Sequence, residues 1–157
     1  MKKTLTLLCT SFVILFSACT KSGETPQLSD SNWTFNGVIH FATTSNRLEA
    51  SGTNAAYVNF TDKNKDRNGT LTVFFKALPR VNASYTIVRS SAALSDTQCA
   101  ITTSDATGTG FIFSGTTTAS VQVSFVDGKI KIDIPSIAMS TAAGSENYTL
   151  QGSVYER

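Results

Sequence analysis

Residues 119–134, ASVQVSFVDGKIKIDI, contain the pattern that decides the fold of this chain. Apolar residues alternate with polar ones on both sides of an Asp127-Gly128 dipeptide. This period of two predicts two strands, each with one buried face and one solvated face. Asp-Gly favours a two-residue type I′ turn, because both central residues of that turn need a positive φ. Such a turn aligns the apolar residues on one face, with the pairs Phe125–Ile130, Val123–Ile132 and Val121–Ile134.

A second hairpin is expected at residues 32–41, where Asn36-Gly37 supplies the other strong type I′ dipeptide. A two-residue turn here pairs Phe35 with Val38 and Trp33 with His40, so these four side chains share one face. Ile39 and Phe41 take the opposite face.

The rest of the chain shows short alternating segments and no sustained helical period. This pattern favours an all-β fold, a mostly antiparallel β-sandwich, with a lipocalin-like meander β-barrel as the alternative. Pro135 is expected to end the main hairpin, and one helical turn could form around residues 92–94. The further expected strands are residues 47–51, 55–61, 70–77, 84–89, 98–103, 111–114, 136–140 (an edge strand) and 147–155.

The first 19 residues have the pattern of a secretory signal. Lys2 and Lys3 precede an apolar stretch that is shorter than the roughly 20 residues a bilayer requires. The sequence Phe16-Ser17-Ala18-Cys19 follows and resembles a bacterial lipobox, with Phe in place of the usual Leu. The resemblance implies a signal peptide over residues 1–18 and a lipid on Cys19. The alternative is an ordinary signal peptide that leaves Cys19 free or removes it.

Residues 19–31 are polar and rich in Ser, Gly and Pro, which predicts a flexible tether before a single all-β domain over residues 32–157. The chain has 13 Lys and Arg against 11 Asp and Glu, and cleavage of the signal removes two of the basic residues. The mature part is therefore formally neutral, so no basic field favours nucleic acid. Cys9 leaves with the signal and Cys19 is acylated, so Cys99 has no partner for an intramolecular disulfide.

The overall plan also resembles small all-β lipoproteins of Gram-negative bacteria. The matching residues are the segment 33–37, Pro79 with residues 84–88, the segment 127–130 and the segment 150–154. These motifs are strand-and-turn patterns and carry no activity. In lipoprotein sorting, an Asp directly after the cysteine retains a protein at the inner membrane, whereas this chain has Thr20. The resemblance therefore implies the outer membrane, with the periplasmic face favoured over the cell surface.

Residues 62–69, DKNKDRNG, place oxygen side chains at Asp62, Asn64, Asp66 and Asn68, as at the start of a calcium loop. Arg67 and Val73 occupy the positions where such a loop needs Gly and Glu, so a solvated hairpin tip is favoured and no cofactor or metal is expected. His40 is the one histidine of the chain. We expect it to pack against Trp33. The alternative is an exposed Trp33/His40/Tyr platform that binds a sugar or an apolar ligand.

Cys99 is expected to be a buried, inert thiol, and the acids form no paired catalytic motif. The sequence thus favours a non-enzymatic, lipid-anchored module that binds an envelope protein or a glycan. The alternative is a barrel that carries a small apolar ligand, which requires a cavity of several hundred Å³ inside the barrel.

Overall fold

The computed structural model describes residues 31–144 and 147–157, and the described part of the chain is all-β. The expected signal peptide, Cys19 and the tether up to residue 30 lie outside the described residues. No helix among the described residues has the length and apolar character that a membrane span requires. The strands are β1 (Asn32–Phe35), β2 (Val38–Phe41), β3 (Thr44–Leu48), β4 (Ala56–Asp62), β5 (Gly69–Phe75), β6 (Ala83–Val88), β7 (Gln98–Ser104), β8 (Gly110–Phe113), β9 (Ser120–Val126), β10 (Lys129–Thr141) and β11 (Tyr148–Tyr155).

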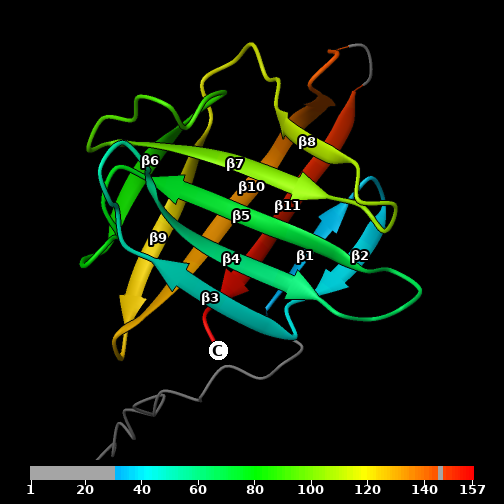
Figure 1. Cartoon of the computed structure of the whole chain (residues 1–157), viewed down its shortest axis with the longest axis horizontal. Coiled ribbons are helices and arrows are strands. Elements are labelled where there is room, and N and C mark those ends of the chain that lie inside the picture. The colour runs from blue at the N-terminus through cyan, green and yellow to red at the C-terminus, as the bar shows by residue number, and fades with distance from the viewer. Residues whose placement is uncertain (1–30, 145–146) are drawn as a thin grey trace, which may run out of the picture.

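All eleven strands belong to one sheet, in the order β2-β1-β11-β10-β9-β6-β7-β5-β4-β3 (Figure 1). The strand β8 lies off this path and pairs with both β7 and β10. The described pairings are antiparallel except for β6 with β7, which run parallel. The mostly antiparallel architecture predicted from the sequence is therefore confirmed, with one parallel pair that was not predicted.

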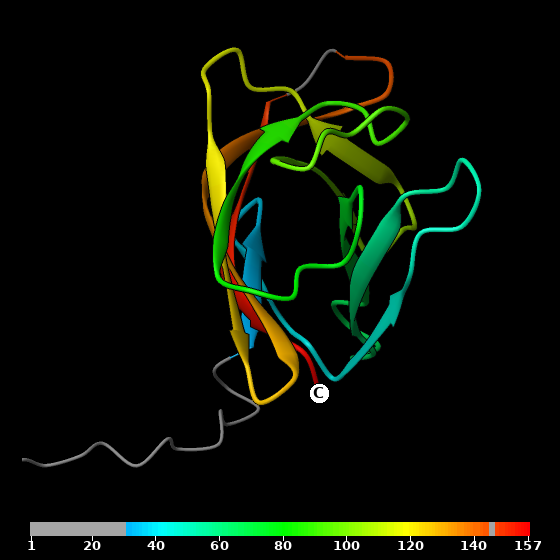
Figure 2. The same ribbon diagram turned by 90° about the vertical axis from the view of Figure 1, so that its left-hand side faces the viewer.

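The sheet bends over itself into two facing layers. Figure 2 shows β1, β9, β10 and β11 on one side and β3, β4 and β5 on the other. Large apolar side chains from both layers fill the space between them, and the largest fully buried ones are Trp33, Phe60 and Phe75. The alternating burial along β4 and β5 reflects the strand period of two, since every second side chain points into this core.

Both predicted hairpins are confirmed with their registers. In the β9–β10 hairpin, Phe125 pairs with Ile130 and Val123 with Ile132, and Asp127 and Gly128 have φ of 52° and 77°. In the β1–β2 hairpin, Trp33 pairs with His40, and Asn36 and Gly37 have φ of 47° and 81°. Positive φ at both central residues is what a type I′ turn requires.

Four local expectations are wrong. Pro135 does not end the main hairpin, because β10 continues through it to Thr141 with a bulge between Ile134 and Ile137. The bulge explains why a proline is tolerated here. Residues 136–140 are consequently part of β10 and form no edge strand, since they pair with both β11 and β8. The weak strand at residues 47–51 is β3 at Thr44–Leu48, and residues 92 and 93 form a turn in place of the expected helical turn.

The two ends of the strand path, β2 and β3, do not pair with each other in the described part of the chain. Side chains near the C-terminus connect β3 to the β9–β10 hairpin instead. Glu156 is 6% exposed and accepts hydrogen bonds from the Ile130 amide at 2.6 Å and from Arg47 at 3.2 Å. Arg47 also donates to the Gly128 carbonyl, so the edge of β3 is held without a further ladder.

Candidate functional site

A half-open cleft of about 300 Å³ lies where the β1–β2 turn, the β4–β5 loop, the β7–β8 loop and the start of β11 meet. We take this cleft as the candidate site. Its apolar part consists of Phe35, Val38, Ala106, Phe111 and Tyr148, and its polar part consists of Asn36, His40, Asp66, Arg67, Asp105 and Thr107.

Gly69 allows β2, the start of β5 and the end of β7 to approach one another closely. A Cβ atom at Gly69 would lie 2.9 Å from His40 Cε1 and 2.9 Å from the Ser104 carbonyl oxygen. Those distances are shorter than real Cβ contacts, so only glycine fits between β2 and the end of β7. The loops that follow Ser104 and precede Gly69 are thereby brought to the same end of the molecule.

Three aromatic rings form the apolar wall of the cleft. Phe35 and Phe111 have ring centroids 4.6 Å apart, and Tyr148 lies 4.7 Å from Phe111 and 5.7 Å from Phe35. The tilted and edge-on arrangements are those that aromatic quadrupoles favour. Phe35 and Phe111 are nearly buried, whereas Tyr148 is half-buried and is the most accessible ring of the three.

Trp33 and His40 do not form the exposed platform that was the alternative reading of the sequence. Trp33 is fully buried and His40 is 2% exposed, and their rings stack with centroids 5.0 Å apart and planes 10° apart. Packing of His40 against Trp33 is therefore the correct reading. His40 still lines the cleft, and its Nδ1 has no hydrogen-bond partner within the described ranges.

Asp62 lies behind His40 and is fully buried. Its Oδ2 accepts hydrogen bonds from Arg67 Nε at 2.8 Å and from the Phe41 amide at 3.1 Å, and its Oδ1 accepts from the Asn64 amide at 3.0 Å. The guanidinium of Arg67 also lies 4.9 Å from the ring centroid of Phe41, within cation–π distance. The Asp62 carboxylate therefore holds the β4–β5 loop, through Arg67 and Asn64, and also the last residue of β2, Phe41.

Two of the four oxygen side chains of the calcium-loop pattern, those of Asp62 and Asn64, have other roles. Asn64 accepts the Asp66 amide at 3.0 Å, which makes a second Asx turn directly after that of Asp62. Asp66 and Asn68 are exposed. Within residues 31–144 and 147–157, no three His, Cys, Asp or Glu side chains form a group that could hold a metal ion.

The ionisation of His40 and Asp62 follows from their burial and their partners. Burial lowers the pKa of His40, and it outweighs the opposing effects of the Asp62 charge and of a hydrogen bond with the Arg67 backbone. Burial alone would raise the pKa of Asp62, but the hydrogen bonds from Asn64, Arg67 and Phe41 and the Arg67 charge hold it below its usual value. At neutral pH the cleft wall therefore contains a neutral imidazole and an Asp62–Arg67 ion pair.

The β7–β8 loop contributes an acid that the sequence analysis did not select. Asp105 Oδ1 accepts hydrogen bonds from the Thr107 amide, the Thr107 hydroxyl and the Thr109 amide at 2.9, 2.7 and 3.0 Å. Burial would raise the pKa of Asp105, but these hydrogen bonds lower it below its usual value, so the group is a carboxylate at neutral pH. Neither Asp105 nor Asp66 has an ion-pair partner among the residues that the structure describes.

Phe35, Phe111, Tyr148 and Asp105 are among the cleft residues that sequence reasoning missed as a site. The Asp105-x-Thr107 spacing is an Asx-turn signal and could have identified the loop. Nothing in the chain order shows that residues 35, 111 and 148 meet, because their contact depends on β8 joining β10.

Cys99 lies outside the cleft and is fully buried. Burial raises the pKa of its thiol to about 12, which makes a thiolate nucleophile inaccessible at neutral pH. The prediction of a buried cysteine is confirmed.

Comparison of the chain with protein-family models, with curated protein sequences and with solved structures gives no match.

Proposed function

We propose that this chain is a lipid-anchored binding domain of the bacterial cell envelope, attached through Cys19 and without catalytic activity. The observation that carries the proposal is the cleft of about 300 Å³, which combines an aromatic wall with polar groups from several loops. Clefts that combine apolar walls with a few placed polar groups are the usual form of a binding site.

The arrangement of the chain supports an anchored binder. The described part begins at Ser31, directly before β1, whereas the Asn36-Gly37 turn that borders the cleft follows the other end of β1. A strand rises about 3.3 Å per residue, so roughly 13 Å of β1 separates the attachment point from this turn. An anchor at Cys19 would leave the cleft accessible to a partner in the envelope, with the periplasmic face of the outer membrane as the proposed location.

The chemistry of the cleft favours binding over catalysis. The chain has one histidine, which is buried against Trp33. Cys99 is buried far from solvent, and the nearest carboxylate to His40, Asp62, is held by three donors. Each of these groups is therefore engaged in structure and not poised to attack a substrate.

An envelope protein or a glycan is the proposed partner class, in preference to the alternative of an apolar-ligand carrier. A carrier needs a cavity inside the fold, whereas large side chains fill the space between the two layers. The cleft lies at the border of that core and is bordered by polar loops, which suits recognition of a partly polar group.

Two valines offer a matched test of this proposal. Val38 and Val126 are each 47% exposed and each flank a type I′ turn, but only Val38 is a cleft residue. The acylated chain and its Val38→Lys and Val126→Lys variants should be used to capture partners from an envelope extract and to probe a glycan array. We expect Val38→Lys to abolish capture or glycan binding and Val126→Lys to preserve it. Equal binding by both variants, or no binding by the unsubstituted chain, would refute the proposal.

Lipidation itself is tested by metabolic labelling with a fatty acid. The label should enter the unsubstituted chain and be absent from a Cys19→Ala variant. Label in the variant, or a mature N-terminus elsewhere than Cys19, would contradict the proposed anchor.

A further inference from the structure

The charges at the cleft indicate which kind of group it accepts. Arg67 is the one cation among the cleft residues, and its Nε lies 2.8 Å from the buried Asp62 carboxylate. This ion pair is internally neutral. His40 is neutral as well, because burial lowers its pKa. The two remaining charged groups that line the cleft are Asp66 and Asp105, which leave an excess of negative charge among the lining residues.

The hydrogen-bonding groups point to the same conclusion. Carboxylates accept hydrogen bonds and do not donate them. Asp66 has no side-chain hydrogen bond within residues 31–144 and 147–157, and in Asp105 the three bonds given above all fall on Oδ1. His40 is 2% exposed and its Nδ1 lies 3.7 Å from the buried Asp62 Oδ2, so the two acids are the acceptors left for a ligand. A ligand rich in donors would satisfy this set of groups, whereas an anion would be repelled.

The apolar wall restricts the rest of the ligand. Phe111 and Tyr148 line the cleft beside the two acids, and Tyr148 is half-buried. A cation within about 6 Å of an aromatic ring is further attracted by the quadrupole of the ring. A volume of about 300 Å³ lies at the lower end of the roughly 300–1,000 Å³ typical of ligand pockets. The cleft therefore suits one extended side chain with an aliphatic stem and a charged tip.

We propose that the cleft binds a protonated primary amine at the end of an apolar stem, namely a lysine side chain of an envelope protein. The stem lies against Tyr148 and Phe111, and the ammonium group lies between Asp66 and Asp105. This inference rests on the binding function proposed above and adds the chemistry of the partner.

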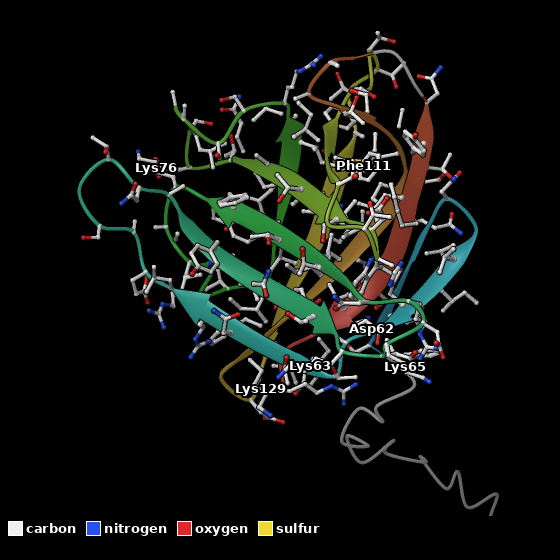
Figure 3. All side chains as sticks on the ribbon, turned by 45° about the vertical axis from the view of Figure 1, so that its right-hand side comes forward. Asp62, Lys63, Lys65, Lys76, Phe111 and Lys129 are labelled. Atoms are coloured by element: carbon white, nitrogen blue, oxygen red, sulfur yellow. The ribbon has the colours of Figure 1, made fainter. Side chains whose placement is uncertain are left out.

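Two further lysines of the β4–β5 loop reduce this preference without lining the cleft. Lys63 and Lys65 are exposed and are not among the cleft residues. In Figure 3 both lie toward the lower end of the molecule with Asp62, whereas Phe111 lies toward the upper end. Lys65 directly precedes Asp66 and lies within the screening length of about 10 Å at 0.1 M ionic strength, so it partly offsets the Asp66 charge and leaves Asp105 as the stronger acid of the cleft.

Three probes of one shape test the inference directly. Benzylammonium, benzyl alcohol and benzoate differ in the charge of one substituent and can be titrated into the full chain with chemical shifts as the readout. We expect benzylammonium to bind about five times more tightly than benzyl alcohol and benzoate not to bind. The backbone amide signals that shift on titration should belong to the residues that line the cleft.

Isosteric substitutions separate the role of charge from that of shape. Asp66→Asn and Asp105→Asn should each reduce the benzylammonium preference about two- to threefold, as expected for half-exposed ion pairs. Asp127→Asn is the matched control, because it removes the same charge at a turn where Asn is equally favoured. Equal affinities for the three probes would overturn the inference. So would a neutral sugar, N-acetylglucosamine, that binds more tightly than benzylammonium and whose affinity is the same in both Asn variants.

A capture experiment distinguishes this inference from the binding function itself. Acetylation of the lysines in an envelope extract removes their charge, so the unsubstituted chain should lose its partner after that treatment. Capture that persists after acetylation, and that is equal for the Asp66→Asn and Asp127→Asn variants, would retain the binding function and refute the lysine assignment. No capture from either extract, together with no binding on the glycan array, would refute the binding function, and the benzylammonium titration would still decide the chemistry of the cleft.

Discussion

Replacement of Asp62 by Asn is the most informative single change in this protein. Asp62 is fully buried, and its two oxygens accept three hydrogen bonds, from Arg67, Phe41 and Asn64. Asn has the same shape, so Asp62→Asn opens no cavity and changes only charge and hydrogen bonding. The measured loss of stability therefore reports on these interactions alone.

The expected loss can be estimated from the geometry. An amide oxygen placed where Oδ2 is now keeps the donors Arg67 and Phe41, and its NH₂ group then faces the Asn64 amide. That unsatisfied N–H costs about 1–3 kcal/mol, and the two remaining bonds weaken by about 1 kcal/mol each when their acceptor loses its charge. Because compensation by water near the half-exposed Arg67 reduces the sum, we expect a loss of about 3 kcal/mol.

Equilibrium unfolding in urea at pH 7 measures this loss, with Asp127→Asn as a control expected to change the unfolding free energy by less than about 0.5 kcal/mol. The same substitution in an Arg67→Met background should cost about 1 kcal/mol less, because the ionic partner is already absent. A loss below about 1 kcal/mol, or equal losses in both backgrounds, would refute the idea that Asp62 holds the loop.

The lowered pKa of Asp62 means that its contribution is complete above its usual pKa of 3.8 and is lost as the pH falls through the lower folded value, so the unfolding free energies of the unsubstituted chain and Asp62→Asn should converge below pH 3.8. The lowered pKa of His40 means that stability declines as the pH falls below 6.5, and His40→Gln should remove this decline in unfolding curves recorded at each pH. Cys99, whose pKa is raised to about 12, should react with a thiol reagent only after unfolding, as located by peptide mass spectrometry. Gly152→Ala would place a Cβ 2.5 Å from the Asn32 carbonyl oxygen and should cost about 3 kcal/mol or more in unfolding free energy, whereas Gly110→Ala meets nothing within 4 Å and should cost less than about 0.5 kcal/mol.

The sequence determines the hairpins because turn chemistry and strand period are local signals that agree. Asp127-Gly128 and Asn36-Gly37 each adopt the positive φ values that their dipeptides favour. A one-residue slip at either turn would move a row of core side chains into water. Register could therefore be predicted before any long-range contact was known.

The errors occur where a long-range contact overrides a local signal. Pro135 is a strong local terminator, but β10 passes it because β8 and β11 both pair with the segment beyond it. The parallel pairing of the consecutive strands β6 and β7 has the same origin, since β6 also pairs with β9 and β7 with β5. The Asn36-Gly37 turn predicts that His40 packs against Trp33, but the rest of its environment comes from Asp62 and Gly69 in another hairpin.

Because Trp33 and His40 are buried, the candidate site is the cleft at the end of the sheet and not the β1–β2 face. A binding platform on the β1–β2 face would have tied ligand contacts to core residues, so any change in specificity would have disturbed the fold. In this structure the core face of the hairpin is closed by stacking, and the exposed polar cleft groups Asp66 and Thr107 belong to loops. Loop residues change with less effect on stability than core residues. Substitutions of Asp66 should therefore alter binding without the stability loss expected for Asp62, although the two residues lie only four positions apart.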